Sequence, residues 1–369
     1  MKIMDEVKKN LRKRVRGNNE MPQEPSAKSN ETNDGECEDY KTITNSSPKP
    51  YTRGDSLTVD LANMINNPLY SDLVIRCKDD EELHANKLFL AGRSEYFNDL
   101  LFQQQQTKES SHLPNKIIVP DVTSPIVKIV LEFLYTGKVS DKTLTIDIVS
   151  DIYNGASVFV LPKLKEIIIQ FMKSYMKHRH NVGSSNQIAK ILSEISNSAS
   201  NDDDDQLIEE ICKFLMSKSL YKIDYHNLSS KALEYLLSRT LNMKEGNFFT
   251  TEYDVLRYCI LWAVDQIEVN DVLYFSLLLP SNGDLEGQKV NELDPIDPNN
   301  QLLQQHQHKI KTILNSILNF IDFRLIHASI LAKLIEPLDI VKPSTITDAY
   351  RYQAQCADGL VQMKRGSQE

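Results

Sequence analysis

Few residues of this chain have both the type and the spacing that chemistry at a protein site requires. Two histidine pairs, His178/His180 and His306/His308, offer nitrogen ligands, but both lie in polar segments without a cysteine or carboxylate at zinc-ligand spacing. Four consecutive aspartates begin at Asp202, and neighbouring carboxylates point apart rather than toward one cation. The sequence therefore predicts no metal site and no cofactor.

One serine stands in a motif that could supply a nucleophile. Gly54-Asp55-Ser56-Leu57 resembles the nucleophile motif of the GDSL hydrolases. That serine requires an apolar strand before it and a downstream Asp-x-x-His to supply the base and its orienting group. A polar Asn-Ser-Ser-Pro-Lys-Pro segment precedes it here, and Asp-x-x-His occurs nowhere in the chain. We therefore interpret Asp55-Ser56 as the N-cap of a helix over 57–65 and predict no catalytic residue and no enzyme.

The composition is that of a protein with sizeable cores. The chain has 369 residues, 41% of them hydrophobic, which predicts two domains or three small ones. The formal net charge of −9 argues against nucleic acid as a partner. Five widely separated cysteines fit reduced thiols inside the cell. No apolar run approaches the length of a membrane span.

The elements between 71 and 153 predict a small sheet covered by helices. Alternating apolar residues over 73–77 lead into an acidic turn, as in a strand that enters a hairpin. Residues 116–119 are a second β-branched run that ends at a proline. From 125 to 134 apolar residues recur at helical spacing, and Gly137 stands where a helix C-cap is expected. The pattern is α+β.

Four segments, in this order, resemble the BTB/POZ domain. They are Ser71–Cys77, Leu83–Leu90 with His-x-x-Lys-x-x-Leu, Arg93–Phe97 with Ser-x-Tyr-Phe, and Leu131–Val139 with Tyr-Thr-Gly. The resemblance implies an α+β BTB/POZ domain, which we expect over residues 55–160. It also implies a homodimer that binds other proteins.

In that family the helix before the first strand packs against a second copy. The corresponding stripe here consists of Leu57, Leu61, Met64 and Ile65. Such a stripe could also pack on its own domain, and the dimer is the interpretation that we favour. Asp72 and Lys87 match the family's charged pair at the dimer groove. Asn86 replaces the usual histidine before Lys87, and asparagine can also cap a helix.

Many BTB–BACK proteins hold cullin-3 ubiquitin ligases, so the resemblance implies cullin-3 as a partner. The family contact uses an apolar-x-Glu motif, and the nearest match is Thr107-Lys108-Glu109. Thr107 is polar at the motif position where the family inserts an apolar side chain into the cullin interface. The missing apolar contact weakens that interface by about 1–2 kcal/mol. Phe102 is the third residue expected at this contact. Helices over 161–195 extend the interface in the family.

The second half of the chain predicts an all-α, BACK-like helical domain over 161–355. Residues 233–243 and 252–264 resemble BACK, in which a Leu-Leu-Ser-Arg turn precedes a helix with an apolar-Trp-apolar pattern. Trp262 falls at that position and is interpreted as a core anchor. The polar residues 281–308 are expected to form a flexible insert, and 356–369 a tail. No segment resembles a kelch or MATH module.

Residues 1–54 are expected to combine a basic N-terminal helix with a disordered linker. Apolar residues recur every four positions over 1–16, between many lysines and arginines. Such a helix could bind an acidic lipid surface or act as a nuclear signal, and a frayed, solvated end is the interpretation that we favour.

These patterns together predict a non-enzymatic, homodimeric adaptor that recruits an unknown protein substrate to a cullin-3 ubiquitin ligase, within the ubiquitin-like (Ubl) conjugation pathway. The alternative is a dimeric BTB scaffold, cytoplasmic or transcription-linked, without any ligase role. The expected location is the cytoplasm or the nucleus.

Overall fold

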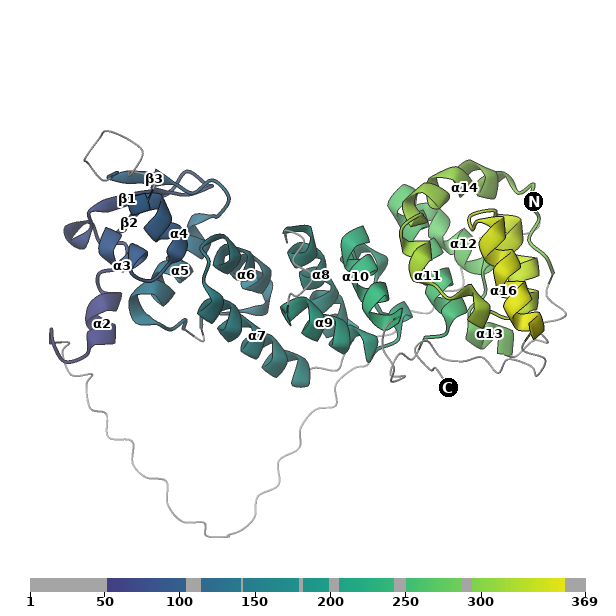
Figure 1. The fold of residues 1–369 in the computed structure, drawn as a ribbon, viewed down its shortest axis with the longest axis horizontal. Helices are drawn as coiled ribbons and strands as arrows, with labels where there is room; N and C mark the ends of the chain where they lie inside the picture. The colour runs from purple at the N-terminus through teal and green to yellow at the C-terminus, as the bar shows by residue number, and fades with distance from the viewer. Residues whose placement is uncertain are drawn as a thin grey trace, which may run out of the picture. The chain divides into compact units, whose positions relative to one another are not determined.

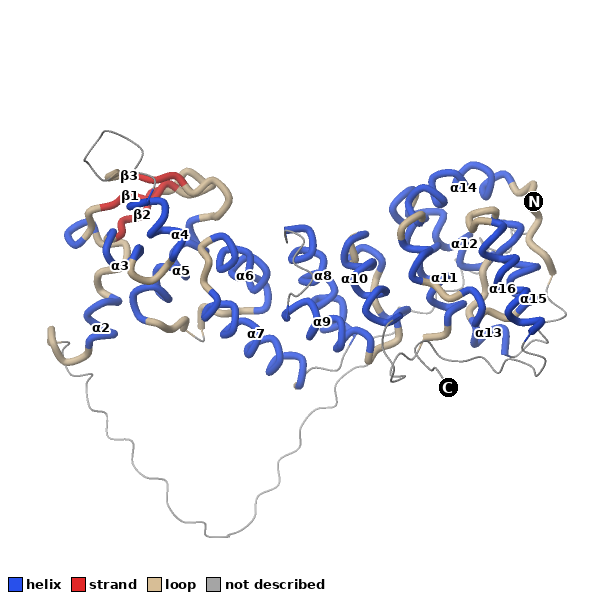
Figure 2. Tube along the Cα trace, in the orientation of Figure 1, coloured by secondary structure: helices blue, strands red, loops and turns tan. Residues whose placement is uncertain are grey.

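A three-stranded sheet is the centre of the N-terminal module in the computed structural model (Figures 1 and 2). In spatial order its strands are β2 (Glu82–Ala85), β1 (Leu73–Arg76) and β3 (Lys116–Ile118). β1 and β2 form an antiparallel hairpin, whereas β3 runs parallel to β1. The predicted alternation is confirmed in β1, where Leu73 and Ile75 are buried and Arg76 is exposed.

The structure describes seven stretches of the chain. These are residues 52–103, 114–140, 142–178, 182–198, 206–241, 250–286 and 294–355. The expected basic N-terminal helix, nearly all of the expected linker, and the expected tail lie outside them.

Among the described residues, five helices pack around the sheet, and the fourth of them, α5, lies in the middle of the core. They are α2 (Leu57–Ala62), α3 (Lys87–Ala91), α4 (Glu95–Asn98), α5 (Ser124–Thr136) and α6 (Val149–Val158). The predicted C-cap of α5 is confirmed: Gly137 has φ 74°, and its N–H donates to the Phe133 carbonyl at 2.8 Å. The helix predicted over 57–65 is shorter, since α2 ends at Ala62 and turns come after it.

After α6 the described chain is helical. The longer helices are α7 (Pro162–Lys177), α8 (Val182–Ser198), α9 (Gln206–Met216), α10 (Ser230–Leu241), α11 (Glu252–Ile267), α12 (Val272–Leu278), α14 (Gln301–Leu314) and α16 (Pro343–Gln355). Short α13 (Asn282–Glu286) and α15 (Ala328–Ile330) complete the set, together with several single turns. The prediction of a helical second half is confirmed.

Trp262 anchors the core of this helical region, as predicted. Its side chain is only 3% exposed, and its indole N–H donates to the Leu228 carbonyl at 2.8 Å. The helix that carries it, α11, is buried along most of its length and packs against α12 and α14. A buried indole with a satisfied N–H is the arrangement that stabilises such a core.

One continuous core joins the sheet to the helices C-terminal to it. Buried apolar side chains form a single cluster that runs from Leu73 to Ala349. α6 packs against α5, α7 and α8, and the buried Ser94 hydroxyl donates to the Phe159 carbonyl at 2.7 Å. Val160, with φ 52°, makes the turn between α6 and α7. The packing is therefore continuous across residue 160, from α6 into α7.

The flexible insert predicted at 281–308 is wrong in the part that the structure describes. α13 and the first half of α14 lie within it. Asn300 caps α14 by accepting hydrogen bonds from the N–H groups of Leu302 and Leu303 at 3.1 and 3.2 Å. Leu303 and His306 are buried on the helix. This narrow buried face could not be predicted from a segment so rich in glutamine and histidine.

Candidate protein-interaction surfaces

The apolar stripe that the sequence predicted is exposed at its first residue and half-buried at the other three. Leu57 is 74% exposed, whereas Leu61, Met64 and Ile65 are half-buried against the core of their own domain. Ser56 is the N-cap residue but its side chain makes no capping hydrogen bond. The part of the stripe that α2 leaves open to another molecule is therefore its first turn.

Asp72 and Lys87 lie together without forming an ion pair. One Asp72 carboxylate oxygen accepts the backbone N–H of Lys87 at 2.8 Å. The Lys87 side chain is buried, and its ammonium donates to the Asn115 amide oxygen at 3.0 Å. The interpretation of these two residues as a charged pair is therefore wrong in the detail of their contact. Asn86 caps α3 as predicted, accepting from the Leu88 N–H at 3.1 Å.

Only one of the three residues expected at a cullin contact lies within the described residues. Phe102 belongs to a π-helical segment, Asp99–Gln103, that continues α4, and its ring is half-buried against the core. Thr107 and Glu109 lie outside the described residues.

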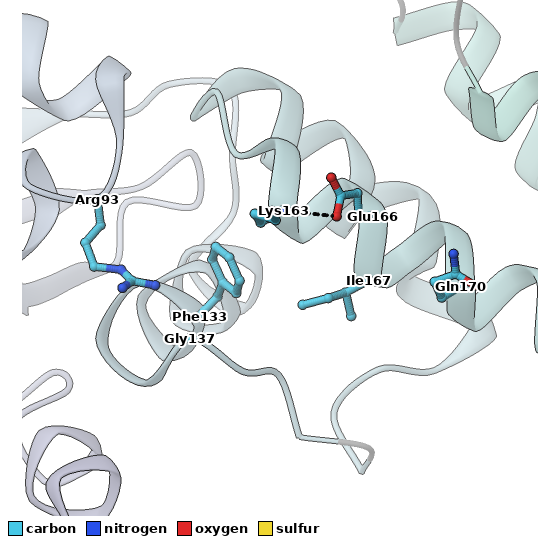
Figure 3. A pocket seen from close by; sticks show the side chains of 7 residues that line it. All are labelled: Arg93, Phe133, Gly137, Lys163, Glu166, Ile167 and Gln170. Carbon is cyan, nitrogen blue, oxygen red and sulfur yellow. Dashed lines mark hydrogen bonds and ion pairs between the residues drawn. The ribbon is translucent and has the colours of Figure 1, made fainter.

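A pocket of about 570 Å³ lies where the end of α5 meets the first turns of α7 (Figure 3). Its lining residues come from three segments: Arg93, Phe133, Gly137, Lys163, Glu166, Ile167 and Gln170. Phe133 and Ile167 supply the apolar part of the lining and are buried and half-buried. The other side chains are polar, and Arg93 reaches in from the opposite side to the Lys163–Glu166 pair (Figure 3).

The polar lining of this pocket is open to water. Lys163 and Glu166 form an ion pair of 2.8 Å, yet their side chains are 76% and 59% exposed, so the pair contributes little to stability. A Cβ at Gly137 would lie 3.6 Å from an Arg93 guanidinium nitrogen, so the guanidinium lies close beside this turn. The pocket thus combines a small apolar part, Phe133 and Ile167, with exposed charges of both signs, as protein-interaction surfaces do.

The sequence did not predict this pocket, although it contained part of the signal. Arg93 and Gly137 belong to two of the four motifs that resemble the BTB/POZ domain, and they are far apart in the chain. They become neighbours only through the packing of α5. Ile167, from α7, completes the pocket from outside the expected domain boundary.

A cluster of polar side chains in the sheet module holds its hairpin turn onto α5. The Ser124 N–H and hydroxyl donate to the two Asp79 carboxylate oxygens at 3.0 and 2.8 Å. Lys128 donates to Glu81 at 2.8 Å and, with Ser124, holds the pKa of that carboxyl below its ordinary value. Every member of the cluster thus has a structural partner.

Metal-ligand clusters are absent from the described part of the chain. Within it, no three His, Cys, Asp or Glu side chains gather closely enough to hold a metal ion. His306 instead places its Nε2 atom 2.8 Å from an Asp271 carboxylate oxygen. None of the helices that the structure describes is both long and apolar enough to cross a membrane.

Comparison with known proteins identifies the sheet module. Residues 61–175 match the family model of the BTB/POZ domain, a range that includes α6 and most of α7. In Drosophila melanogaster, BTB/POZ domain-containing protein 9 is 24% identical over 216 residues, covering 57% of this chain and 26% of that protein. In Homo sapiens, BTB/POZ domain-containing protein 19 is 28% identical over 121 residues, 32% of this chain and 39% of that protein.

Two further matches have a lower sequence identity. Kelch-like protein 40a of Danio rerio is 22% identical over 113 residues, 31% of this chain and 17% of that protein. The solved BTB domain of human Gigaxonin is 21% identical and covers 28% of this chain and 78% of that one, with a TM-score of 0.23. This chain thus spans well under half of the length of the curated relatives that it matches.

Proposed function

We propose that this chain, which contains a BTB/POZ domain over residues 61–175, is a homodimeric adaptor that recruits a protein substrate to a cullin-3 ubiquitin ligase. The observation that carries the proposal is the pocket between α5 and α7, the last helix of the range that matches the BTB/POZ domain. In the resembling family the helices at this position extend the cullin interface. The function is binding rather than catalysis.

The pocket supports cullin binding independently of the apolar-x-Glu motif. Phe133 and Ile167 offer an apolar anchor site that includes none of the residues of the motif. A partner side chain that fills such a pocket can supply about 1.5–3 kcal/mol. That gain is of the size needed to offset the polar residue at position 107.

The cullin proposal is tested by titrating the full chain with the cullin-3 N-terminal domain in a calorimeter. Ile167→Asp should weaken binding at least about tenfold, because a charge would replace apolar lining. Ser174→Asp, on an exposed position of the same helix, is the matched control and should bind like the unaltered chain. Equal binding by both variants would remove the pocket from the interface.

Thr107→Met tests the motif itself. Added apolar burial of about 1.4 kcal/mol should tighten binding roughly tenfold, and Glu109→Ala should weaken it. If neither the unaltered chain nor Thr107→Met binds the cullin domain, the adaptor proposal fails.

The homodimer proposal is supported by the exposure of Leu57. Burying that side chain against a second copy would contribute about 1–2 kcal/mol per subunit. Leu57→Asp should therefore shift the chain toward monomer in sedimentation experiments, whereas the exposed neighbour Thr58→Asp should not. Leu61 and Met64 are poorer targets, because both pack on their own domain. A monomeric unaltered chain at micromolar concentration would contradict the proposal.

A second candidate function is a dimeric scaffold without any ligase role, in the cytoplasm or linked to transcription in the nucleus. The polar Thr107 at the apolar motif position favours it. It predicts a dimer that does not bind the cullin domain, so the cullin titration and the sedimentation experiment together distinguish it from the adaptor.

A further inference from the structure

One side of α7 forms a wall of the α5–α7 pocket. The lining residues from this helix recur at intervals of three and four positions, so they lie on the same side of it: Lys163, Glu166, Ile167 and Gln170. At a rise of about 1.5 Å per residue, this wall is about 10 Å long. An extended segment of about three residues spans that length.

The charges that line the pocket do not balance. Lys163 and Glu166 neutralise each other in their ion pair of 2.8 Å. Arg93 forms no ion pair and no hydrogen bond with any residue that the structure describes. Glu132, the only carboxylate of α5, instead accepts the Ser140 N–H at 3.1 Å. The lining therefore carries one positive charge that has no counter-charge among the described residues.

An apolar surface lies beside that charge. Figure 3 shows the Phe133 ring between the Arg93 guanidinium and the Ile167 side chain. Arg93 also lies near the C-terminal end of α5, where the helix dipole favours a cation. The dipole uses none of the guanidinium's five N–H donors, so they stay open to a ligand. A ligand that suits both features has an apolar group next to a negative charge.

We propose that the α5–α7 pocket recognises a segment of a partner protein in which a large apolar residue stands next to an aspartate or glutamate. The apolar side chain packs on Phe133 and Ile167, and the carboxylate accepts hydrogen bonds from Arg93. A guanidinium donates to both oxygens of a carboxylate at once, which makes this contact strong and directional. The inference rests on the proposed function only in taking this pocket as a protein-binding site, and it adds the chemistry of the bound segment.

The test uses the full chain and fluorescent synthetic peptides, each with one dipeptide in the middle of a Gly/Ser sequence. Fluorescence anisotropy measures the Kd at physiological salt. The Leu-Glu peptide should bind most tightly. Leu-Gln should raise the Kd about tenfold, because it loses the charged hydrogen bonds, and Ser-Glu should raise it at least as much, because it loses the apolar contact. Leu-Lys should bind most weakly, since it places a like charge next to Arg93.

A charge reversal on the protein tests the same contact from the other side. Arg93→Glu should bind the Leu-Lys peptide more tightly than Leu-Glu, because the new carboxylate pairs with the lysine. A misfolded variant would not gain such a preference. Lys142→Glu is the matched control, because it makes the same change of charge at an exposed position outside the pocket. It should keep the peptide order of the unaltered chain.

Several results would overturn the proposal. They are no binding of the Leu-Glu peptide, equal binding of Leu-Glu, Leu-Gln and Leu-Lys, or an Arg93→Glu variant that still prefers Leu-Glu. Equal binding of Ser-Glu and Leu-Glu would also overturn it, because the pocket would then bind anions without selecting an apolar neighbour. If Arg93→Glu changes only the stability to urea, the guanidinium serves the end of α5 and the proposal is wrong.

The cullin titrations report separately on the adaptor function. A chain that selects the Leu-Glu peptide but does not bind the cullin-3 domain supports this inference and refutes the adaptor. A chain that binds the cullin-3 domain through Ile167 but does not distinguish the peptides does the reverse.

Discussion

Replacing Trp262 with alanine should destabilise the helical region by about 3–5 kcal/mol. The side chain is 3% exposed on a helix with solvent on almost no face, so its removal leaves a cavity that neighbours cannot easily fill. It also leaves the buried Leu228 carbonyl without its donor, which accounts for about 1 kcal/mol of that loss. A marginally stable domain could lose most of its stability this way.

Trp262→Phe separates the two contributions. The phenyl ring retains much of the apolar contact but cannot donate to Leu228, so we expect a smaller loss, about 1–2 kcal/mol. Both variants are compared by urea unfolding measured through far-ultraviolet circular dichroism, because Trp262 is the only tryptophan and its fluorescence is lost. The slope of the unfolding free energy against urea should not change.

The order of stabilities decides whether this reasoning holds. It requires the unaltered chain to be most stable, the phenylalanine variant intermediate and the alanine variant least stable. If the alanine variant unfolds at the same urea concentration as the unaltered chain, the indole is not buried as described. If both variants lose the same stability, the hydrogen bond rather than packing is the main contribution of Trp262.

Two glycine substitutions and the labelling of two buried cysteines test other parts of the fold. Gly155→Ala should cost about 1–2 kcal/mol in urea unfolding, because the new Cβ would lie 2.8 Å from an Ile126 methyl between α5 and α6. Gly137→Ala should cost about 1 kcal/mol by the same measurement, since φ 74° is unfavourable for any residue with a Cβ. Burial raises the pKa of Cys77 to about 11 and that of Cys212 to about 12, so iodoacetamide at pH 8 should label both in the native chain more than about a hundredfold slower than in urea, as measured by mass spectrometry. Because those folded-state pKa values lie above the unfolded ones, the two thiols favour the folded state below pH 9, and this contribution is lost as the pH rises through 11 to 12.

The sheet module could be predicted from sequence because its signals are local. The alternation over β1, the β-branched residues of β3 and the glycine after α5 each fix one element without reference to its neighbours. Trp262 could be placed in the core because the residues on either side of it, from Ile260 to Val264, are all apolar. The start of α14 was not predicted because it buries only Leu303 and His306 among many glutamines and histidines.

The candidate site depends on contacts that no local pattern contains. The α5–α7 pocket requires Arg93, Phe133 and Ile167 to meet, and these residues come from three segments that are far apart in the chain. Asp72 and Lys87 were correctly expected to be neighbours. The hydrogen-bond partner of the Lys87 ammonium could not be predicted, because Asn115 belongs to another segment. The Asn115 amide oxygen accepts the hydrogen bond that we expected a carboxylate to accept.

The continuous core has a practical consequence for anyone who wishes to excise the BTB/POZ domain. A fragment that stops at residue 160 would remove α7 and expose the face of α6 that α7 covers. It would also discard Leu164, Ile168 and Met172, all completely buried, so we expect that fragment to aggregate. A fragment that extends to Lys177 keeps this helix, but it still exposes the faces of α6 and α7 that α8 and α9 cover.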